Sequence, residues 1–166
     1  HCFGTSDFYS VSLIALGCEA TEVIANADML QAMWLRENGG GIEARSIWAR
    51  IKQRFSIDQA STQHASRLDI LRQQIRKAKP DILYVQDLSL CPPVMLSELK
   101  NDCRLIVGQI PCPLPPHDHL RSYDLLVTSL PNYLEQFRSM GMPAAYLPLG
   151  FEPRVLRLVG LQPKIY

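Results

Sequence analysis

Short apolar runs alternate with helical stripes along this chain. One strand is predicted at Glu19–Ala25, where Val23 and Ile24 form the apolar centre, and four clearer strands follow it along the chain. The alternation of strands with helices predicts an α/β fold with a parallel sheet flanked by helices. The four clearest runs have the length and composition of strands buried on both faces of a parallel sheet and lie at Ile82–Gln86, Arg104–Gln109, Asp124–Thr128 and Ala144–Pro148.

The helical stripes between these runs begin and end at recognisable cap and stop residues. An apolar helix is predicted over Asp7–Leu16, with Thr5 or Ser6 as its N-cap and Gly17 as its stop. In the last predicted helix, Phe137 is expected to face the sheet. The other helices are predicted at Asp28–Asn38, Glu43–Phe55, His64–Ala78, between Pro93 and Asn101, and between Pro131 and Gly141.

The length of 166 residues suits a single domain that spans residues 1–166. No apolar run approaches the length of a membrane span, and five cysteines without a CxxC pair favour reduced thiols in a cytoplasmic protein. The chain opens at His1 with a loop and a helix whose strand would precede them, so a domain truncated at both ends is expected. In a doubly wound sheet that first strand would be central, between the strands at Glu19–Ala25 and Arg104–Gln109.

Charge is unevenly distributed along the chain. Between residues 31 and 79 there are ten Lys or Arg residues and four Asp or Glu residues, although the net charge of the chain is only +1. Such a segment could meet a phosphate or a membrane surface, but charges on the polar faces of amphipathic helices are the favoured interpretation, and no nucleic-acid partner is predicted. Gly39, Gly40 and Gly41 lack the strand before and the GK[ST] after that a phosphate loop needs, so they are interpreted as a linker.

The segment His117-Asp118-His119 is the only histidine cluster. Two histidines one residue apart can bind a metal ion, but no third ligand lies near them in the sequence, so a solvated loop is favoured and no metal site is predicted. His117 or His119 as a catalytic base is retained as an alternative. The chain has no GxSxG, P-loop or HExxH motif, and Gly150 is not part of a GxGxxG pattern, which argues against a dinucleotide dehydrogenase.

Several segments together resemble the N-terminal half of a GT-B glycosyltransferase. They are YVQDLS from Tyr84, LIVGQI from Leu105 with the proline loop that follows it, YDLLVTSLPNYLEQFRSMG from Tyr123, and YLPLGFEPRVL from Tyr146. FGTSDFYS from Phe3 and LGCEATEVIAN from Leu16 are similar as well, although Cys18 stands where a histidine is expected. The resemblance is to bacterial enzymes related to the spore-maturation group and covers nearly the whole chain.

This resemblance implies two Rossmann-like domains that bind different substrates. The half in this chain would bind the acceptor, and a second domain, C-terminal to Tyr166, would bind the nucleotide-sugar donor. No cofactor is therefore expected in this domain. Acceptor contacts are implied for residues in the loops that follow the strands: Gly4, Thr5, Ser6, Gln86, Ser89, Gln109, Pro111, Ser129, Gly150 and Glu152.

Glycosyl transfer needs a group that takes the proton of the acceptor hydroxyl, and stabilisation of the departing nucleoside diphosphate. Asp7 and Asp87 are the carboxylates best placed for the first task and are the catalytic candidates. Asp7 at a helix start is also explained as a first-turn residue that stabilises the helix dipole. No helix start explains Asp87. Glu152 could equally be a surface residue of an interdomain hinge.

Two classes of function follow from these observations. The first is the acceptor-binding half of a glycosyltransferase, with a saccharide, a protein or a small molecule as acceptor and the C-terminal domain as partner. Residues 1–166 alone are then expected to transfer no sugar, because groups that stabilise the leaving diphosphate would lie in the other domain. The second is a non-catalytic α/β module for ligand binding or scaffolding, favoured by the lack of a complete catalytic constellation.

Overall fold

The computed structural model describes residues 7–38, 59–110, 114–148, 150, 152–155 and 160, and the side chains of 59–66 are outside this description. The chain divides into two compact units. One consists of residues 23–146, and the other combines residues 1–22 with residues 147–166. The larger unit contains all the strands described.

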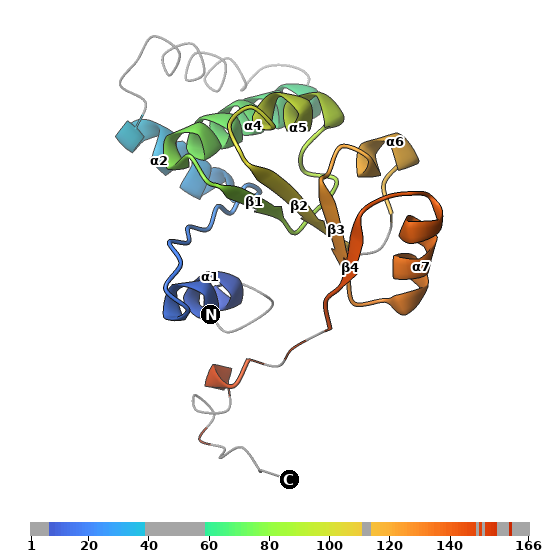
Figure 1. The fold of residues 1–166 in the computed structure, drawn as a ribbon. Coiled ribbons are helices and arrows are strands. Elements are labelled where there is room, and N and C mark those ends of the chain that lie inside the picture. Colours follow the sequence, from blue (N-terminus) through green and yellow to red (C-terminus); the bar gives the residue numbers. More distant parts are fainter. Residues whose placement is uncertain are drawn as a thin grey trace. The chain divides into compact units, whose positions relative to one another are not determined.

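Four parallel strands form the sheet of the larger unit (Figure 1). The strands β1 (Ile82–Val85), β2 (Leu105–Gln109), β3 (Leu125–Thr128) and β4 (Ala144–Tyr146) lie side by side in their order along the chain. Each pair of neighbours is parallel. The predicted α/β fold with a parallel sheet is therefore confirmed, and four of the five predicted strands are present within two residues of their expected ends.

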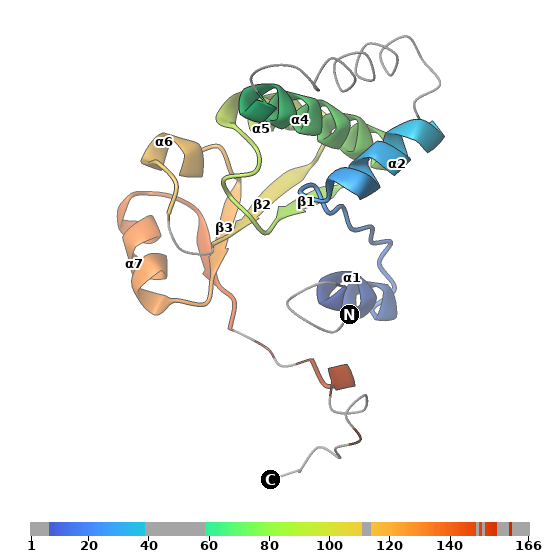
Figure 2. The same cartoon turned by 180° about the vertical axis from the view of Figure 1, so that it is seen from behind.

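Helices connect these strands and pack with them in one core. They are α4 (Gln59–Ala78) before β1, α5 (Pro93–Leu99) between β1 and β2, α6 (His117–Leu120) between β2 and β3, and α7 (Pro131–Ser139) between β3 and β4. The strand register places Val85, Ile106, Leu126 and Ala144 on one face of the sheet. Residues from this face and from all four helices form a single apolar cluster. Figure 2 shows the helices and the sheet from behind.

The β3-α7-β4 unit follows its sequence signals closely. Pro131 is the first residue of α7, where a missing N–H costs nothing, and Gly141 ends the helix with φ of +70°. The Gly141 N–H donates to the carbonyl of Arg138 at 3.0 Å, and the Met142 N–H donates to that of Phe137 at 2.9 Å. This is the Schellman arrangement, and it turns the chain directly into β4.

The remaining helices agree with the pattern in part. The helix α2 (Asp28–Asn38) has the predicted bounds, and α4 begins before the predicted His64. The predicted loop at His117–His119 is wrong, because His117–Leu120 form the short helix α6 with Pro116 as its N-cap. Pro116 has an extended backbone that suits the residue before a first turn, which the sequence pattern did not reveal. The predicted helix Glu43–Phe55 and the glycine linker lie outside the described residues.

In the smaller unit, α1 (Phe8–Ala15) is the predicted apolar helix. Gly17, with φ of +86°, ends it through bonds from the Gly17 and Cys18 N–H groups to the carbonyls of Ile14 and Leu13. The N-cap position belongs to Asp7 and not to Thr5 or Ser6, and the Asp7 side chain makes no cap hydrogen bond. Its carboxylate is directed to an arginine instead, as described below.

Two expectations about the strands are wrong. Residues 18–24 have no regular secondary structure, although a strand was predicted at Glu19–Ala25, and the side chains of Val23 and Ile24 are exposed. Alternation of apolar residues makes a strand only where a neighbouring strand takes up its backbone hydrogen bonds, and none of the strands in the described sheet does so. Strand β2, expected beside a missing central strand, has β1 and β3 as its neighbours.

None of the helices in the described part of the chain combines the length and the apolar character needed to cross a membrane.

We expect Phe137→Ala to lower the free energy of unfolding by about 3 to 5 kcal/mol, because the side chain is fully buried between α7 and the sheet and its loss leaves a cavity. Urea titration followed by circular dichroism measures this change. Glu135→Ala on the exposed side of the same helix is the matched control and should change the stability little. A small effect of Phe137→Ala would mean that the inner face of α7 is wrongly assigned.

A second prediction concerns Asp124, which joins the start of β3 to β2. Burial raises the pKa of Asp124, but bonds from Lys100 Nζ and the Ile106 N–H, both at 2.8 Å, outweigh this effect and leave the pKa below its usual value. A lowered folded-state pKa contributes stability above the unfolded value, about pH 4, and this stability is lost as the pH falls through the folded value.

Asp124→Asn should therefore cost about 1 to 2 kcal/mol at pH 7 and less at about pH 3, below the unfolded-state pKa of about 4, where the stability from the lowered pKa is being lost. Urea unfolding at both pH values, with Asp81→Asn as an exposed control, provides the measurement. An equal loss at both pH values would exclude the charge of Asp124 as the source of the effect.

Candidate functional site

Polar residues that the sequence singled out gather at one edge of the sheet in the larger unit. Gln86, Asp87 and Ser89 follow β1, Gln109 is the last residue of β2, and Ser129 follows β3 directly. Because β1, β2 and β3 are adjacent and parallel, their carboxyl ends meet at the same edge. This is the edge at which open α/β sheets bind ligands. The fold thus brings these five residues to one edge, and acceptor binding by them stays a prediction.

Asp87 occupies the first position of a tight turn at this edge. Its Oδ1 accepts hydrogen bonds from the Ser89 N–H at 2.9 Å and from the Ser89 hydroxyl at 2.6 Å, and its carbonyl accepts one from the Leu90 N–H at 3.0 Å. This is an Asx-turn, which orients the carboxylate through its own main chain. Asp87 and Ser89 are both exposed, so the carboxylate and the hydroxyl are open to solvent.

The turn is anchored by Leu88, the residue between these two exposed side chains. Leu88 is 1% exposed and belongs to the core of the larger unit. It packs over Gly108 in β2, where an added Cβ would lie 2.5 Å from Leu88 Cδ2 and 2.8 Å from Tyr123 Cδ1. A side chain at position 108 would therefore require Leu88 or Tyr123 to shift. Gly108 therefore sets how closely the Asp87 turn approaches the sheet.

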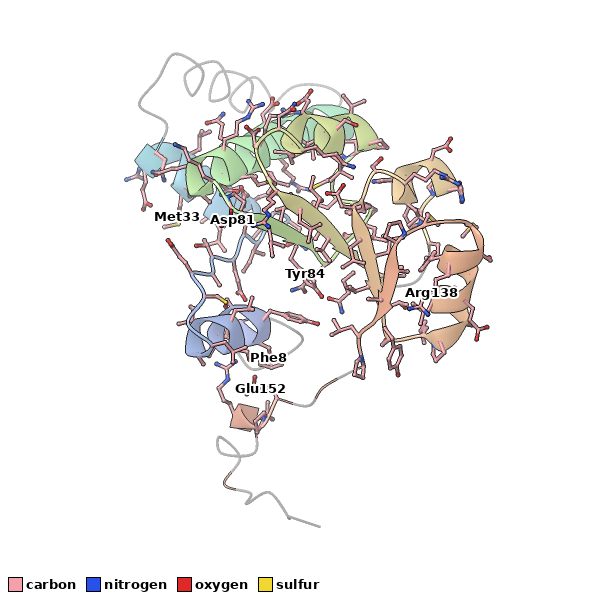
Figure 3. All side chains as sticks on the ribbon, viewed as in Figure 1. Phe8, Met33, Asp81, Tyr84, Arg138 and Glu152 are labelled. Carbon is pink, nitrogen blue, oxygen red and sulfur yellow. The ribbon has the colours of Figure 1, made fainter. Side chains whose placement is uncertain are left out.

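Tyr84 is a residue of this edge that the sequence did not single out, and it is labelled in Figure 3. Its hydroxyl donates to Gln109 Oε1 at 2.9 Å. Tyr84 lies opposite Val107 in the register, so the bond reaches diagonally from β1 to the end of β2. A tyrosine inside an apolar run is typical of a strand core, and only the strand pairing shows that its hydroxyl orients the amide of Gln109.

The end of β3 is shaped by a further turn. Thr128 is 1% exposed, and its Oγ1 accepts a hydrogen bond from the Leu130 N–H at 3.1 Å. Leu130 is the N-cap of α7 and has no side chain able to cap it. Ser129 lies between them and is half-buried. Thr128 therefore accepts the hydrogen bond of the turn before α7, and Ser129 lies at the carboxyl end of β3.

Asp7 and Glu152 come together in the smaller unit, around Arg154. The Arg154 Nε and Nη2 contact the Glu152 carboxylate at 2.9 and 3.3 Å, and Nη1 and Nη2 contact that of Asp7 at 3.4 and 3.2 Å. The guanidinium also lies over the ring of Phe8, 5.4 Å from its centroid; Phe8 and Glu152 are labelled in Figure 3. The hydrogen bond to Glu152, followed by that to Asp7, raises the pKa of Arg154.

This cluster bears on the catalytic role predicted for Asp7. A cation beside a carboxylate favours its ionised form and makes it a weaker proton acceptor. Glu152 is the more enclosed partner, with its side chain 11% exposed, and its Oε1 also accepts the Arg154 N–H at 3.0 Å. Arg154 was missed because its partner Asp7 lies 147 residues away in the sequence. Of the two catalytic candidates, Asp7 is paired with an arginine, whereas Asp87 is oriented by the neutral donors of Ser89.

Of the other predicted site residues, only Gly150 lies within the described part of the chain. Gly4, Thr5, Ser6 and Pro111 lie outside the described residues. Gly150 is exposed in the smaller unit, with open space where a side chain would project.

The histidines of α6 have local partners. His119 Nε2 lies 2.7 Å from the carbonyl oxygen of Cys91, and His117 Nδ1 accepts a hydrogen bond from Arg121 Nε at 3.3 Å. Across the described ranges, no group of three or more His, Cys, Asp or Glu side chains is arranged to hold a metal ion.

Comparison of the chain with protein-family models, with curated proteins and with solved structures found no match.

We expect Gly108→Ala to destabilise the protein by about 1 to 3 kcal/mol, because the new methyl group must displace Leu88 or the ring of Tyr123. The free energy of unfolding in urea measures the effect. Gly150→Ala is the matched control, since its side chain would enter open space and its φ is not positive. If both variants were equally stable, the close packing at Gly108 would not be what holds the turn.

Proposed function

We propose that this chain is the acceptor-binding half of a glycosyltransferase that moves a sugar from a nucleotide-sugar donor to an acceptor hydroxyl. The observation that carries the proposal is the convergence of Gln86, Asp87, Ser89, Gln109 and Ser129 on the carboxyl edge of three adjacent parallel strands. Amide, hydroxyl and carboxylate groups are the partners that a polyhydroxylated ligand requires. The resemblance of the strand and loop segments to GT-B enzymes supports the same conclusion.

Asp87 is assigned the central role within this proposal. Its Oδ1 is occupied by Ser89, so the turn holds the carboxylate in one orientation while it remains exposed. A carboxylate at hydrogen-bond distance from an acceptor hydroxyl can orient that hydroxyl and take up its proton as the new glycosidic bond forms. Gln109, oriented by Tyr84, would fix a second polar group of the acceptor.

The donor is assigned to a second domain, as the resemblance implies. In this arrangement the diphosphate that leaves is stabilised by groups of the donor domain, and the residues of this chain contribute acceptor binding and orientation. A non-catalytic α/β binding module is the alternative that shares the fold. The two functions differ in whether the acceptor is bound through a hydroxyl that contacts Asp87.

Saturation-transfer NMR with a panel of mono- and oligosaccharides tests the acceptor site. At least one saccharide should bind, and Asp87→Asn should weaken its binding by about ten- to 150-fold, because hydrogen bonds to a charged group contribute about 1.5 to 3 kcal/mol. Asp81→Asn is the matched control: it makes the same chemical change at the opposite end of β1. Deoxygenation of the saccharide at the reactive hydroxyl should abolish the difference between the wild type and Asp87→Asn.

Equal binding by the wild type and Asp87→Asn would contradict the role of Asp87. Failure of every saccharide to bind would overturn the proposal and favour the non-catalytic module. Residues 1–166, mixed with a nucleotide sugar and the bound saccharide, should form no product, and turnover would contradict the assignment of the donor to another domain.

A further inference from the structure

The turn that carries Asp87 is fastened to the sheet by two aromatic side chains from the connection between β2 and β3. The Tyr123 hydroxyl donates to the carbonyl of Leu88 at 3.2 Å, and His119 Nε2 lies 2.7 Å from the carbonyl of Cys91. The two rings stack with an interplanar angle of 16° and a centroid distance of 6.2 Å. One segment thus holds the loop that follows β1 at two points, three residues apart.

We propose that His119 and Tyr123 are positioning residues that clamp residues 87–91 against the sheet and thereby fix the orientation of Asp87. The importance of this clamp for ligand binding rests on the proposed function, but the clamp itself does not. Neither side chain is required to touch a ligand. They act through the main chain on either side of the Asp87 turn.

The chemistry of the two bonds makes both side chains donors. A carbonyl oxygen only accepts, so the hydrogen of neutral His119 is on Nε2. Burial raises the pKa of Tyr123, which therefore keeps its hydroxyl hydrogen at neutral pH. Leu88 is 1% exposed, so its carbonyl oxygen has little access to water. Loss of the Tyr123 hydroxyl would leave this oxygen without its hydrogen-bond donor. The bonds are therefore costly to break unless the loop also moves.

Packing connects the clamp to Asp87. Tyr123 and Leu88 both cover Gly108, so the loop cannot lift from the sheet without exposing the Leu88 side chain and breaking the Tyr123 bond. Asp87 immediately precedes Leu88, and its carbonyl holds the Leu90 N–H. Opening of the loop would therefore release both ends of the Asx-turn together.

Cys91 provides a direct measure of this opening. Its side chain is 1% exposed, and burial raises the pKa of its thiol to about 12, so it reacts slowly with thiol reagents while the loop is closed. Cys103, also buried, precedes β2 at the other edge of the sheet. Labelling of Cys91 in excess of Cys103 thus reports opening of the loop, whereas equal labelling of both reports unfolding of the unit.

The test is the rate of N-ethylmaleimide labelling at each cysteine, resolved by peptide mass spectrometry. Tyr123→Phe removes only the hydroxyl, and His119→Phe keeps an aromatic ring but removes the donor. Each should raise the labelling rate of Cys91 by about two- to tenfold, the effect of one lost hydrogen bond, and leave that of Cys103 unchanged. His119→Gln retains an N–H donor and should restore most of the protection.

Three results would overturn the clamp. They are an unchanged rate at Cys91 in both donor-less variants, a parallel rise at Cys91 and Cys103, and a failure of His119→Gln to protect better than His119→Phe. The measurement needs no ligand, so it stands even if no saccharide binds. Where a saccharide does bind, Tyr123→Phe should weaken its binding in the wild-type background but not in Asp87→Asn, because the clamp acts through Asp87.

Discussion

The close approach of Leu88 and Tyr123 to the main chain of Gly108 is the constraint on which the candidate site depends. An added Cβ at position 108 would lie 2.5 Å from Leu88, so the loop after β1 reaches the sheet only where β2 carries no side chain. Leu88 then fills this space and leaves its two neighbours, Asp87 and Ser89, exposed at the edge. Because Leu88 is buried between two exposed polar residues, its packing in the core also fixes the position of the Asp87 carboxylate.

The sequential order of the strands gives the larger unit its layered construction. Parallel neighbours joined by helices in one direction have their helices on the same face, because such connections are right-handed. Residues from α4, α5, α6 and α7 accordingly meet one face of the sheet in one core. The polar residues at the carboxyl edge stand on this rigid support, which is what a binding site made of loops requires.

The two predicted catalytic carboxylates differ in their surroundings. Asp7 shares Arg154 with Glu152, so its charge is balanced by a cation within the smaller unit. The carboxylate of Asp87 is oriented by the N–H and hydroxyl of Ser89, which are neutral donors. This turn fixes the direction of the Asp87 carboxylate while the residue remains exposed. This difference is why the proposed function gives Asp87, and not Asp7, the contact with the acceptor hydroxyl.

The sequence by itself determined most of the helices and strands, because their signals are local. Gly17 and Gly141 end helices where their backbones take positive φ, and short apolar runs became β1 to β4. The alternation of apolar residues at Glu19–Ala25 wrongly predicted a strand, because a strand also needs a neighbouring strand for its backbone hydrogen bonds. Only the tertiary structure decided that Tyr84 orients Gln109, that Arg154 pairs with Asp7, and that His119 and Tyr123 hold the Asp87 loop. These contacts join residues far apart in the sequence, and their geometry depends on strand order and register, which no local pattern encodes.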